Sequence, residues 1–234
     1  FFYLYDEISF DRFNKNRDRL FRVIQEVVIE GDIFKFDGGS FIMGEEFPSQ
    51  IPQIEQMSRY KSASAIVQIG EENVFESVHF ADPGLFSMLD IHVREGQYFG
   101  FGSPDNILIS ASMSIKLNVG LEELKLNYRG EDKRFQVIGI YDDLPYNSTV
   151  QPDIILPFSY YATRTESRRL NNWHDYNMNA LIMLRDAKDK LFVEQQMTQI
   201  VAGGPGEKSS EKLKLQPYSE IHLDTTYRNG NGLK

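Results

Sequence analysis

Two glycine-containing turns, each between runs that alternate apolar and polar residues, constrain the fold of this chain most. Alternation with a period of two places every second side chain on the same face of a strand. Each turn with its flanking runs therefore predicts an antiparallel hairpin with one face in a core and the other in water. The first hairpin spans Ala63, Ala65, Val67 and Ile69, a turn at residues 70–73, and Val74, Val78 and Phe80. The second spans Leu124, Leu126 and Tyr128, a turn at residues 130–133, and Phe135, Val137 and Tyr141.

A strand, a helix and another strand are predicted near each end of the chain. Residues 19–28 predict the first strand, and Ser40 is expected to cap a short helix that Pro48 and Pro52 interrupt. Near the C-terminus, Asp186 is expected to cap a helix that the glycines of residues 203–206 end, and a strand at residues 213–215 follows. The apolar positions here are Met178, Ala180, Ile182 and Leu184 in the preceding strand and Val193, Met197, Ile200 and Val201 in the helix. Two such segments that share a sheet form a split βαβ layer with helices on one face.

The block between these ends is predicted to be an insertion. It contains a helix at residues 83–89, a strand at 107–109, a helix at 112–117 and the second hairpin. The expected fold class is therefore α+β, with one discontinuous lobe from residues 1–82 and 159–234 and a smaller β-rich lobe from residues 83–158.

Charge and composition exclude several classes of protein. A net charge of −9 argues against nucleic acid as a partner, because phosphate-binding surfaces need clustered Lys and Arg. The chain has no cysteine, which excludes disulfides, cysteine-ligated zinc and thiol catalysis. Its apolar runs, such as residues 154–158 and 180–184, are far shorter than the about 20 residues of a membrane-spanning helix.

Residues 1–5, Phe-Phe-Tyr-Leu-Tyr, resemble the interfacial end of a membrane helix, since aromatic residues collect where a helix meets water. An ordinary first strand is the alternative explanation. Residues 229–232, Asn-Gly-Asn-Gly, are typical of a flexible tether.

Motifs along nearly the whole chain resemble, in order, those of MacB/FtsX-like ABC transporter permeases. Residues 5–23 resemble the segment after the first membrane helix of that family, and Phe135 to Ser148 is the strongest single match. Each motif is short and degenerate, so their order carries the resemblance. The other matching segments are residues 52–55, 82–86, 106–110 and 215–223. The chain departs from the family pattern at Pro48, where relatives carry an uninterrupted helix.

The resemblance implies a periplasmic domain between the first and second membrane helices, with a porter-like lobe of βαβ repeats and an inserted smaller lobe. It places the domain at the periplasmic face of the bacterial inner membrane. The implied partners are the membrane helices of the full-length chain and a cytoplasmic ABC ATPase subunit. A homodimer and a periplasmic or outer-membrane partner are left open.

A search for chemistry predicts no catalytic residue, no cofactor-binding residue and no metal ligand. A phosphate-binding glycine loop is absent, and Gly100-Phe101-Gly102 lacks the third glycine that a pyrophosphate loop needs. The four histidines, His79, His92, His174 and His222, lack the paired spacing of a zinc site.

Three weaker candidates have simpler explanations. His174 with Asp175 could orient a base toward a serine, but no Gly-x-Ser-x-Gly elbow is present. The acidic cluster Asp6, Glu7 and Asp11 could attract calcium but lacks EF-hand spacing, so solvated charges explain it better. The neighbouring carboxyl groups at residues 142 and 143 are expected to serve a turn together with Asn147 and Ser148.

The leading hypothesis is a non-catalytic module that couples cytoplasmic ATP hydrolysis to export or mechanical work across the cell envelope. An extracytoplasmic small-ligand sensor or solute-binding domain is the alternative, and a secreted hydrolase is a distant third. Melting that shifts with a ligand would favour the sensor.

Overall fold

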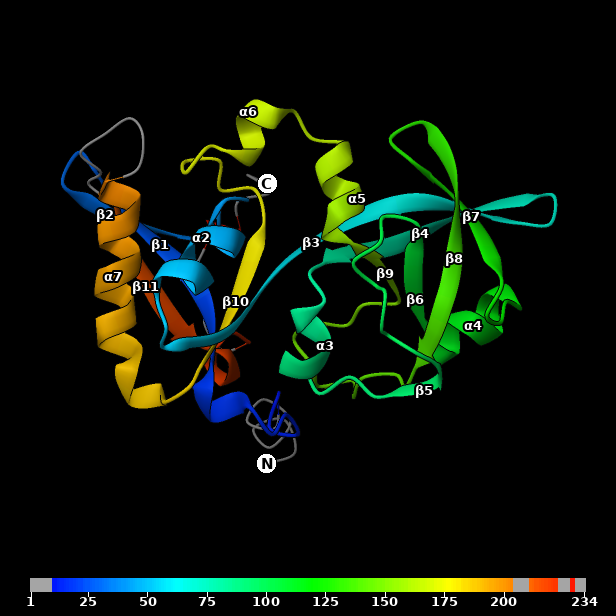
Figure 1. Ribbon diagram of the computed structural model, residues 1–234, viewed down its shortest axis with the longest axis horizontal. Helices are drawn as coiled ribbons and strands as arrows, with labels where there is room; N and C mark the ends of the chain where they lie inside the picture. Colours follow the sequence, from blue (N-terminus) through cyan, green and yellow to red (C-terminus); the bar gives the residue numbers. More distant parts are fainter. Residues whose placement is uncertain (1–9, 204–210, 223–227, 230–234) are drawn as a thin grey trace. The chain divides into compact units, whose positions relative to one another are not determined.

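The computed structural model of this 234-residue chain describes residues 10–203, 211–222 and 228–229. Contacts divide the chain into two compact units: unit 1 is Phe1–Arg59 with Glu166–Lys234, and unit 2 is Tyr60–Thr165. The chain passes into unit 2 within β3 (Ile54–Ile69) and returns after α5 (Phe158–Thr163) (Figure 1). These limits differ from the expected boundaries at residues 82/83 and 158/159, because the first hairpin pairs with strands of unit 2. Which segments fold independently stays a prediction.

The central strand of unit 1 is β1, which confirms the strand predicted there. Phe21 and Arg22 pair with both β10 and β11, so β1 lies between these two strands. Because β10 and β11 both run antiparallel to β1, they run parallel to each other, and the helix that connects them completes the expected split βαβ arrangement. The strands of unit 1 besides the first part of β3 are β1 (Leu20–Ile29), β2 (Asp32–Asp37), β10 (Asn179–Leu184), β11 (Glu211–Pro217) and β12 (Arg228–Asn229).

Two helices cover one face of this sheet, α2 (Met43–Gln50) and α7 (Lys190–Gly203) (Figure 1). Asp186 caps the 3₁₀ turn η2 (Ala187–Asp189) that leads into α7, and its carboxylate accepts the Lys188 N–H at 2.9 Å. The predicted helical spacing is confirmed, since the apolar stripe of α7 packs on the strands. The core contains Phe21, Val23, Met43, Phe47, Ala180, Ile182, Leu184, Val193, Met197, Val201, Leu213 and Leu215. Each large side chain buried there stabilises the fold by about 1.5–3 kcal/mol. Short elements of unit 1 are η1 (Arg17–Arg19), α6 (Ser167–Leu170) and η3 (Tyr218–Glu220).

The expected cap of α2 and its interruption at Pro48 are wrong, whereas the helix does end before Pro52. The helix begins at Met43 without a side-chain cap, and the buried Ser40 hydroxyl accepts no backbone N–H within the described part of the chain. Pro48 lies inside the helix, which continues because Ile51 N–H still bonds the Phe47 carbonyl at 2.9 Å. A helix this short loses only one backbone bond to the proline, and burial of Phe47 and Met43 offsets that loss.

Six strands of unit 2 form a closed ring. Along the ring, β3 pairs with β4, β4 with β9, β9 with β6, β6 with β8 and β8 with β7. β7 also pairs with β3, through the register Val67 to Leu126, and so closes the ring. Closure leaves these strands few free edges. The ring strands other than β3 are β4 (Glu72–Ala81), β6 (Asn106–Ser110), β7 (Glu123–Tyr128), β8 (Glu131–Tyr141) and β9 (Ile154–Pro157), and β5 (Val93–Gly96) pairs with β8 outside the ring.

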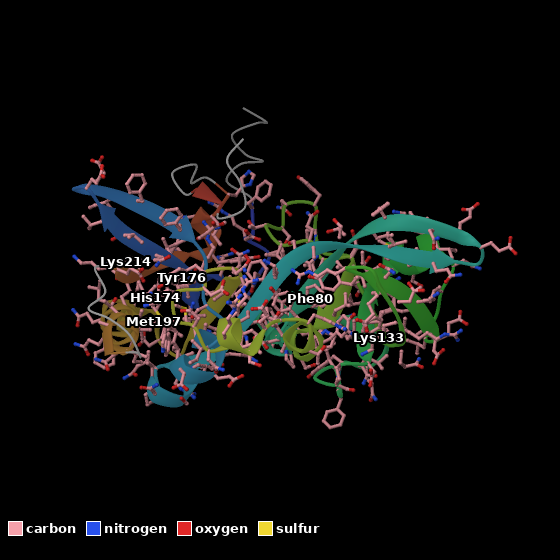
Figure 2. The ribbon with its side chains drawn as sticks, turned by 90° about the horizontal axis from the view of Figure 1, so that it is seen from above. Phe80, Lys133, His174, Tyr176, Met197 and Lys214 are labelled. Atoms are coloured by element: carbon pink, nitrogen blue, oxygen red, sulfur yellow. The ribbon has the colours of Figure 1, made fainter. Side chains whose placement is uncertain are left out.

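Both predicted hairpins are confirmed as β3–β4 and β7–β8, and their inward residues fill the ring. Phe80 lies 4.9 Å from Tyr128 and 5.2 Å from Tyr161 of α5, between ring centroids (Figure 2). Lys133 lies over Tyr160, with Nζ 4.6 Å from the ring centroid. The predicted helices at residues 83–89 and 112–117 are confirmed as α3 (Gly84–Met88) and α4 (Ala111–Leu117).

Within the described ranges, no helix has both the length and the apolar character that crossing a membrane requires.

Candidate functional site

Two segments of unit 1, one around Phe10 near the start of the described chain and one around His222 near its end, lie against each other. The Phe10 ring stacks on the His222 imidazole, with centroids 3.4 Å apart and planes inclined by 5°. The turns η1 and η3, which follow Phe10 and precede His222, are also in contact. Segments from opposite ends of the chain are therefore joined in one unit.

Arg19 fixes residues 10–19, the entering segment that leads into β1, to the sheet. Its guanidinium forms an ion pair with Glu55 at the start of β3 and donates to the Leu184 carbonyl at the end of β10, at 3.3 Å. It also donates to the Asn16 side-chain carbonyl at 3.2 Å. Arg19 therefore ties this segment to two strands, β3 and β10.

Arg22 forms a buried polar cluster across three strands of unit 1. Its Nε and Nη2 donate to Gln216 Oε1 on β11 at 3.1 and 2.7 Å. Its Nη1 lies 3.2 Å from Asp37 Oδ2 on β2. Arg22 and Gln216 are buried, and a buried ion pair needs such extra hydrogen bonds to offset its desolvation. The cluster fixes the positions of β2 and β11 relative to β1.

Side chains of α7 satisfy the outer edge of β11. Glu194 Oε1 accepts the Leu215 N–H at 2.9 Å, and Thr198 Oγ1 accepts the Leu213 N–H at 3.0 Å. Lys214 Nζ lies 3.1 Å from Glu194 Oε2, which compensates the buried carboxylate. Helix and strand are therefore bonded at two backbone positions as well as packed, and the edge amides are not available to another strand.

The predicted histidines lie apart. His79 on β4 is buried, and burial lowers its pKa to about 4, so its imidazole is neutral near pH 7. His92 Nδ1 lies 2.8 Å from Asp142 Oδ2, and Arg94 lies 2.7 Å from the other oxygen of that carboxylate. The bond to His92, followed by the charge of Arg94, holds the pKa of Asp142 below its usual range.

His174 and Asp175 do not form a pair. His174 Nδ1 lies 3.3 Å from Glu211 Oε2 and 3.3 Å from the Tyr176 hydroxyl (Figure 2). Asp175 instead accepts two hydrogen bonds from Arg169, at 2.6 and 3.1 Å. Burial and the bond to Glu211 raise the pKa of Tyr176. This arrangement orients no base toward a serine.

The carboxyl candidates also separate, and neither Asp142 nor Asp143 serves the turn expected for them. Asp143 Oδ1 accepts from the N–H of Ser112, at 3.2 Å, and from its hydroxyl, at 2.6 Å, and so serves the start of α4. Asp11 is buried, whereas Asp6 and Glu7 lie outside the described residues. In the part of the chain that the structure describes, no three His, Asp or Glu side chains are grouped to hold a metal ion.

Ser148 serves the turn after β8, as the sequence predicts. Its N–H donates to the Pro145 carbonyl and its hydroxyl to the Val150 carbonyl, both at 2.9 Å. Gly100-Phe101-Gly102 has a packing role, since Phe101 is buried with its ring 4.9 Å from that of Phe86.

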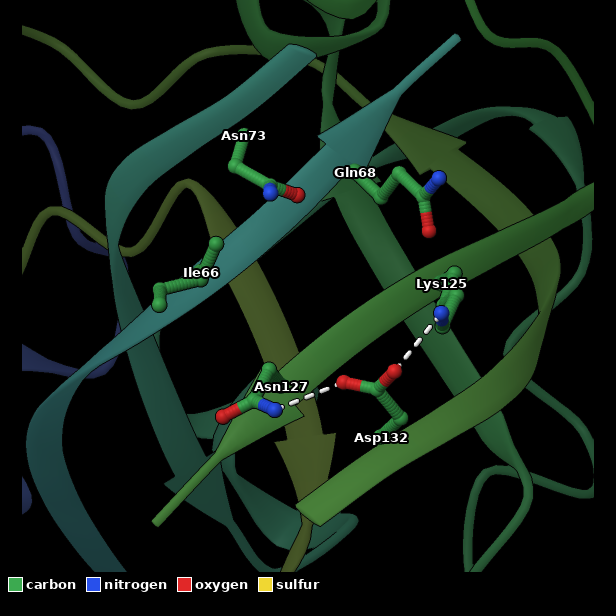
Figure 3. A pocket seen from close by; sticks show the side chains of 6 residues that line it. All are labelled: Ile66, Gln68, Asn73, Lys125, Asn127 and Asp132. Atoms are coloured by element: carbon green, nitrogen blue, oxygen red, sulfur yellow. Dashed lines mark hydrogen bonds and ion pairs between the residues drawn. The ribbon is translucent and has the colours of Figure 1, made fainter. Parts of the chain in front are cut away.

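An open hollow of about 260 Å³ lies on the outward face of the unit 2 ring (Figure 3). Polar side chains from neighbouring strands dominate its lining. Asp132 joins two of them. Its carboxylate accepts a hydrogen bond from the Asn127 side chain at 2.6 Å and forms an ion pair with Lys125 at 2.7 Å. The lining residues are Ile66, Gln68, Asn73, Lys125, Asn127 and Asp132.

Sequence reasoning missed the Arg22 cluster and the Glu194–Thr198 contacts to β11. The partners of Arg22 are 15 and 194 positions away along the chain. A charged residue within an otherwise apolar strand, such as Arg22 between Phe21 and Val23, is the signal that would have drawn attention to it.

A family model described as MacB-like periplasmic core domain matches residues 5–200 of the chain. No curated protein matches the sequence significantly. The fold resembles those of a number of solved structures, three of which follow. The first is a domain of a protein described as a permease from Porphyromonas gingivalis, with a TM-score of 0.71 and 19% identity over 94% of this chain and 95% of that one.

The second is the periplasmic region of MacB from Actinobacillus actinomycetemcomitans, with a TM-score of 0.60 and 13% identity over 88% of this chain and 91% of that one. The third is the extracellular domain of the noncanonic ABC-type transporter YknZ from Gram-positive bacteria. It has a TM-score of 0.57 and 15% identity over 83% of this chain and 98% of that one. At these identities the likeness establishes the α+β fold.

Proposed function

Because the chain belongs to the family of MacB-like periplasmic core domains of ABC transporter permeases, we propose that it is a non-catalytic coupling module. In this proposal, movement of membrane helices driven by ATP hydrolysis enters the domain through its two ends. The domain converts that movement into export or mechanical work on the periplasmic side.

The joined ends of unit 1 carry this proposal. Phe10 stacks on His222, and Arg19 ties the entering segment to Glu55 on β3 and to the end of β10. β3 then continues without a break into unit 2. A joint displacement of both ends would therefore be passed through paired strands, and coupling of this kind needs stiff units more than reactive side chains.

The partners follow from the same proposal. They are the membrane helices of the full-length chain and a cytoplasmic ABC ATPase subunit, with a second copy or a periplasmic or outer-membrane protein as a further candidate. The proposed location is the periplasmic face of the inner membrane. His92 is paired with Asp142, Asp175 with Arg169 and Asp143 with Ser112, and these structural contacts support a domain without a reaction of its own.

The test compares ATP hydrolysis with transport in the same membrane preparation of the intact transporter. Phe10→Ala combined with Arg19→Ala should lower the amount transported per ATP hydrolysed, because both changes loosen the ends from the sheet. Arg168→Ala, which removes an exposed ion pair with Glu166 elsewhere in unit 1, is the matched control and should change neither rate. An unchanged ratio in the double variant would contradict the proposal.

A further inference from the structure

The outward face around the hollow of unit 2 is organised in two rows. The strand registers place Phe75, Ile66, Asn127 and Asp132 opposite one another across β4, β3, β7 and β8. The next row is Asn73, Gln68, Lys125 and Arg134. Directly opposed residues point to the same face of a sheet, so the eight side chains form one continuous surface. Figure 3 shows six of them, all except Phe75 and Arg134.

The charges on this surface are already paired. Lys125 lies 2.7 Å from Asp132, and Arg134 lies 3.4 Å from Glu123 on β7. A charged ligand would have to break one of these ion pairs to gain a partner. The surface therefore favours a neutral ligand.

Two amide groups provide the free hydrogen-bonding capacity. Asn73 is exposed, and its side chain makes no hydrogen bond to any described residue. Gln68 uses its nitrogen to donate to the Gly70 carbonyl at 3.1 Å, which leaves its side-chain oxygen as an acceptor. An amide both donates and accepts, as a hydroxyl group does, so hydroxyl groups are matching partners.

Phe75 supplies an apolar platform beside these amides. Its side chain is 76% exposed and lies opposite Ile66. A flat aromatic face next to free amides matches the two surfaces of a sugar ring, its C–H face and its hydroxyl edge. Four adjacent strands span about 14 Å, which is wide enough for two or three linked sugar rings.

A peptide fits this surface less well. Strand-like peptides bind by adding to an open sheet edge, but β3 is paired on both sides here, with β4 and with β7. We propose that this face binds a neutral oligosaccharide, with one ring stacked on Phe75 and hydroxyl groups bonded by Asn73 and Gln68.

The test titrates the 234-residue chain with chitohexaose, cellohexaose and maltohexaose, and measures binding by calorimetry and by shifts of the Asn and Gln side-chain NMR signals. At least one hexasaccharide should bind, and more tightly than its monosaccharide. Phe75→Ser and Asn73→Ala should each weaken binding roughly tenfold, as expected when a stacking or hydrogen-bonding contact is removed.

The matched control is Phe99→Ser, which removes an aromatic side chain of the same unit that is 83% exposed and lies outside these two rows. It should leave binding unchanged, and thermal unfolding should show that all three variants fold. Absence of binding by all three neutral hexasaccharides would overturn the proposal. So would binding that Phe75→Ser and Asn73→Ala leave intact.

Discussion

Glu194 of α7 accepts the backbone N–H of Leu215 in β11, with 2.9 Å between oxygen and nitrogen. Thr198, one helical turn further on, accepts the N–H of Leu213 in the same way. These two contacts replace a second neighbouring strand, which β11 lacks among the described residues.

Thr198→Val should expose the Leu213 amide to exchange and lower the free energy of unfolding by about 1–2 kcal/mol, because a backbone donor loses its acceptor. Glu194→Ala should cost about 2–3 kcal/mol, since its acceptor is charged. Amide hydrogen exchange and urea unfolding measure both effects. Gln195→Ala, on the exposed side of the same helix, is the control. Unchanged amide exchange at Leu213 in Thr198→Val and at Leu215 in Glu194→Ala would contradict the two hydrogen bonds.

Arg22→Met should destabilise unit 1 by about 3–5 kcal/mol, because the partly buried Asp37 carboxylate loses the cation that buried Arg22 supplies. Adding Asp37→Leu to that variant should recover part of the loss, because the buried charge then disappears as well. A double-mutant cycle in urea measures the coupling. Strictly additive losses would show that the two side chains do not interact.

Cysteines in place of Phe10 and His222 should form a crosslink with a short reagent, because the two rings are in van der Waals contact. The chain contains no cysteine, so no other thiol competes. Phe10→Cys with Ile33→Cys is the control pair. Ile33 pairs with Val28 near the far end of β1, roughly 25 Å along the strand, and should not react. Equal reaction of both pairs would refute the contact between the ends.

His79 should make stability depend on pH between about 6.5 and 4. Its folded-state pKa lies below that of the unfolded chain, so the unfolded state takes up the proton first as the pH falls. The contribution is therefore complete above pH 6.5 and is lost by about pH 4, a loss of about 3 kcal/mol. Urea unfolding of the chain and of His79→Gln across this range measures the difference. If the free energies of unfolding of the two proteins changed equally with pH, protonation of His79 would not destabilise the folded state.

Ser148→Ala and Asn147→Ala should each lower stability by about 1 kcal/mol, the typical net value of a hydrogen bond. The Ser148 hydroxyl loses its bond to the Val150 carbonyl. Thermal unfolding measures the loss, and transport by the intact system is measured beside it. Full stability with abolished transport would show a functional site in place of a structural turn.

Local patterns predicted the hairpins β3–β4 and β7–β8 because each has one buried face, and alternation reports that directly. Patterns could not predict that β7 also pairs with β3, since this pairing joins residues about sixty positions apart and leaves no periodic trace. That pairing closes the ring and moves the first hairpin into unit 2. The same limit hid the contacts of Arg22, whose partners come from β2 and β11.

Single-residue rules failed where tertiary packing opposed them. Pro48 is expected to interrupt α2, yet Met43 and Phe47, both before the proline, anchor the helix in the core. Ser40 has the right residue type for a cap but lies three positions before the helix begins. For the candidate site, sequence singled out His222 as a histidine without suggesting Phe10 as its partner, because stacking across the whole chain length has no local signal.

The antiparallel register of β1 and β11, with Phe21 opposite Pro217 and Val27 opposite Glu211, determines how unit 1 responds to force. The chain enters β1 and leaves β11 at the same end of the pair. A load that pulls these ends apart acts on one interstrand bond at a time, beginning at the Phe10–His222 stack, and so peels the strands open at low force. A load that moves both ends in the same direction does not pull β1 and β11 apart. Unit 1 is thus compliant to separation of its ends and rigid to their common displacement.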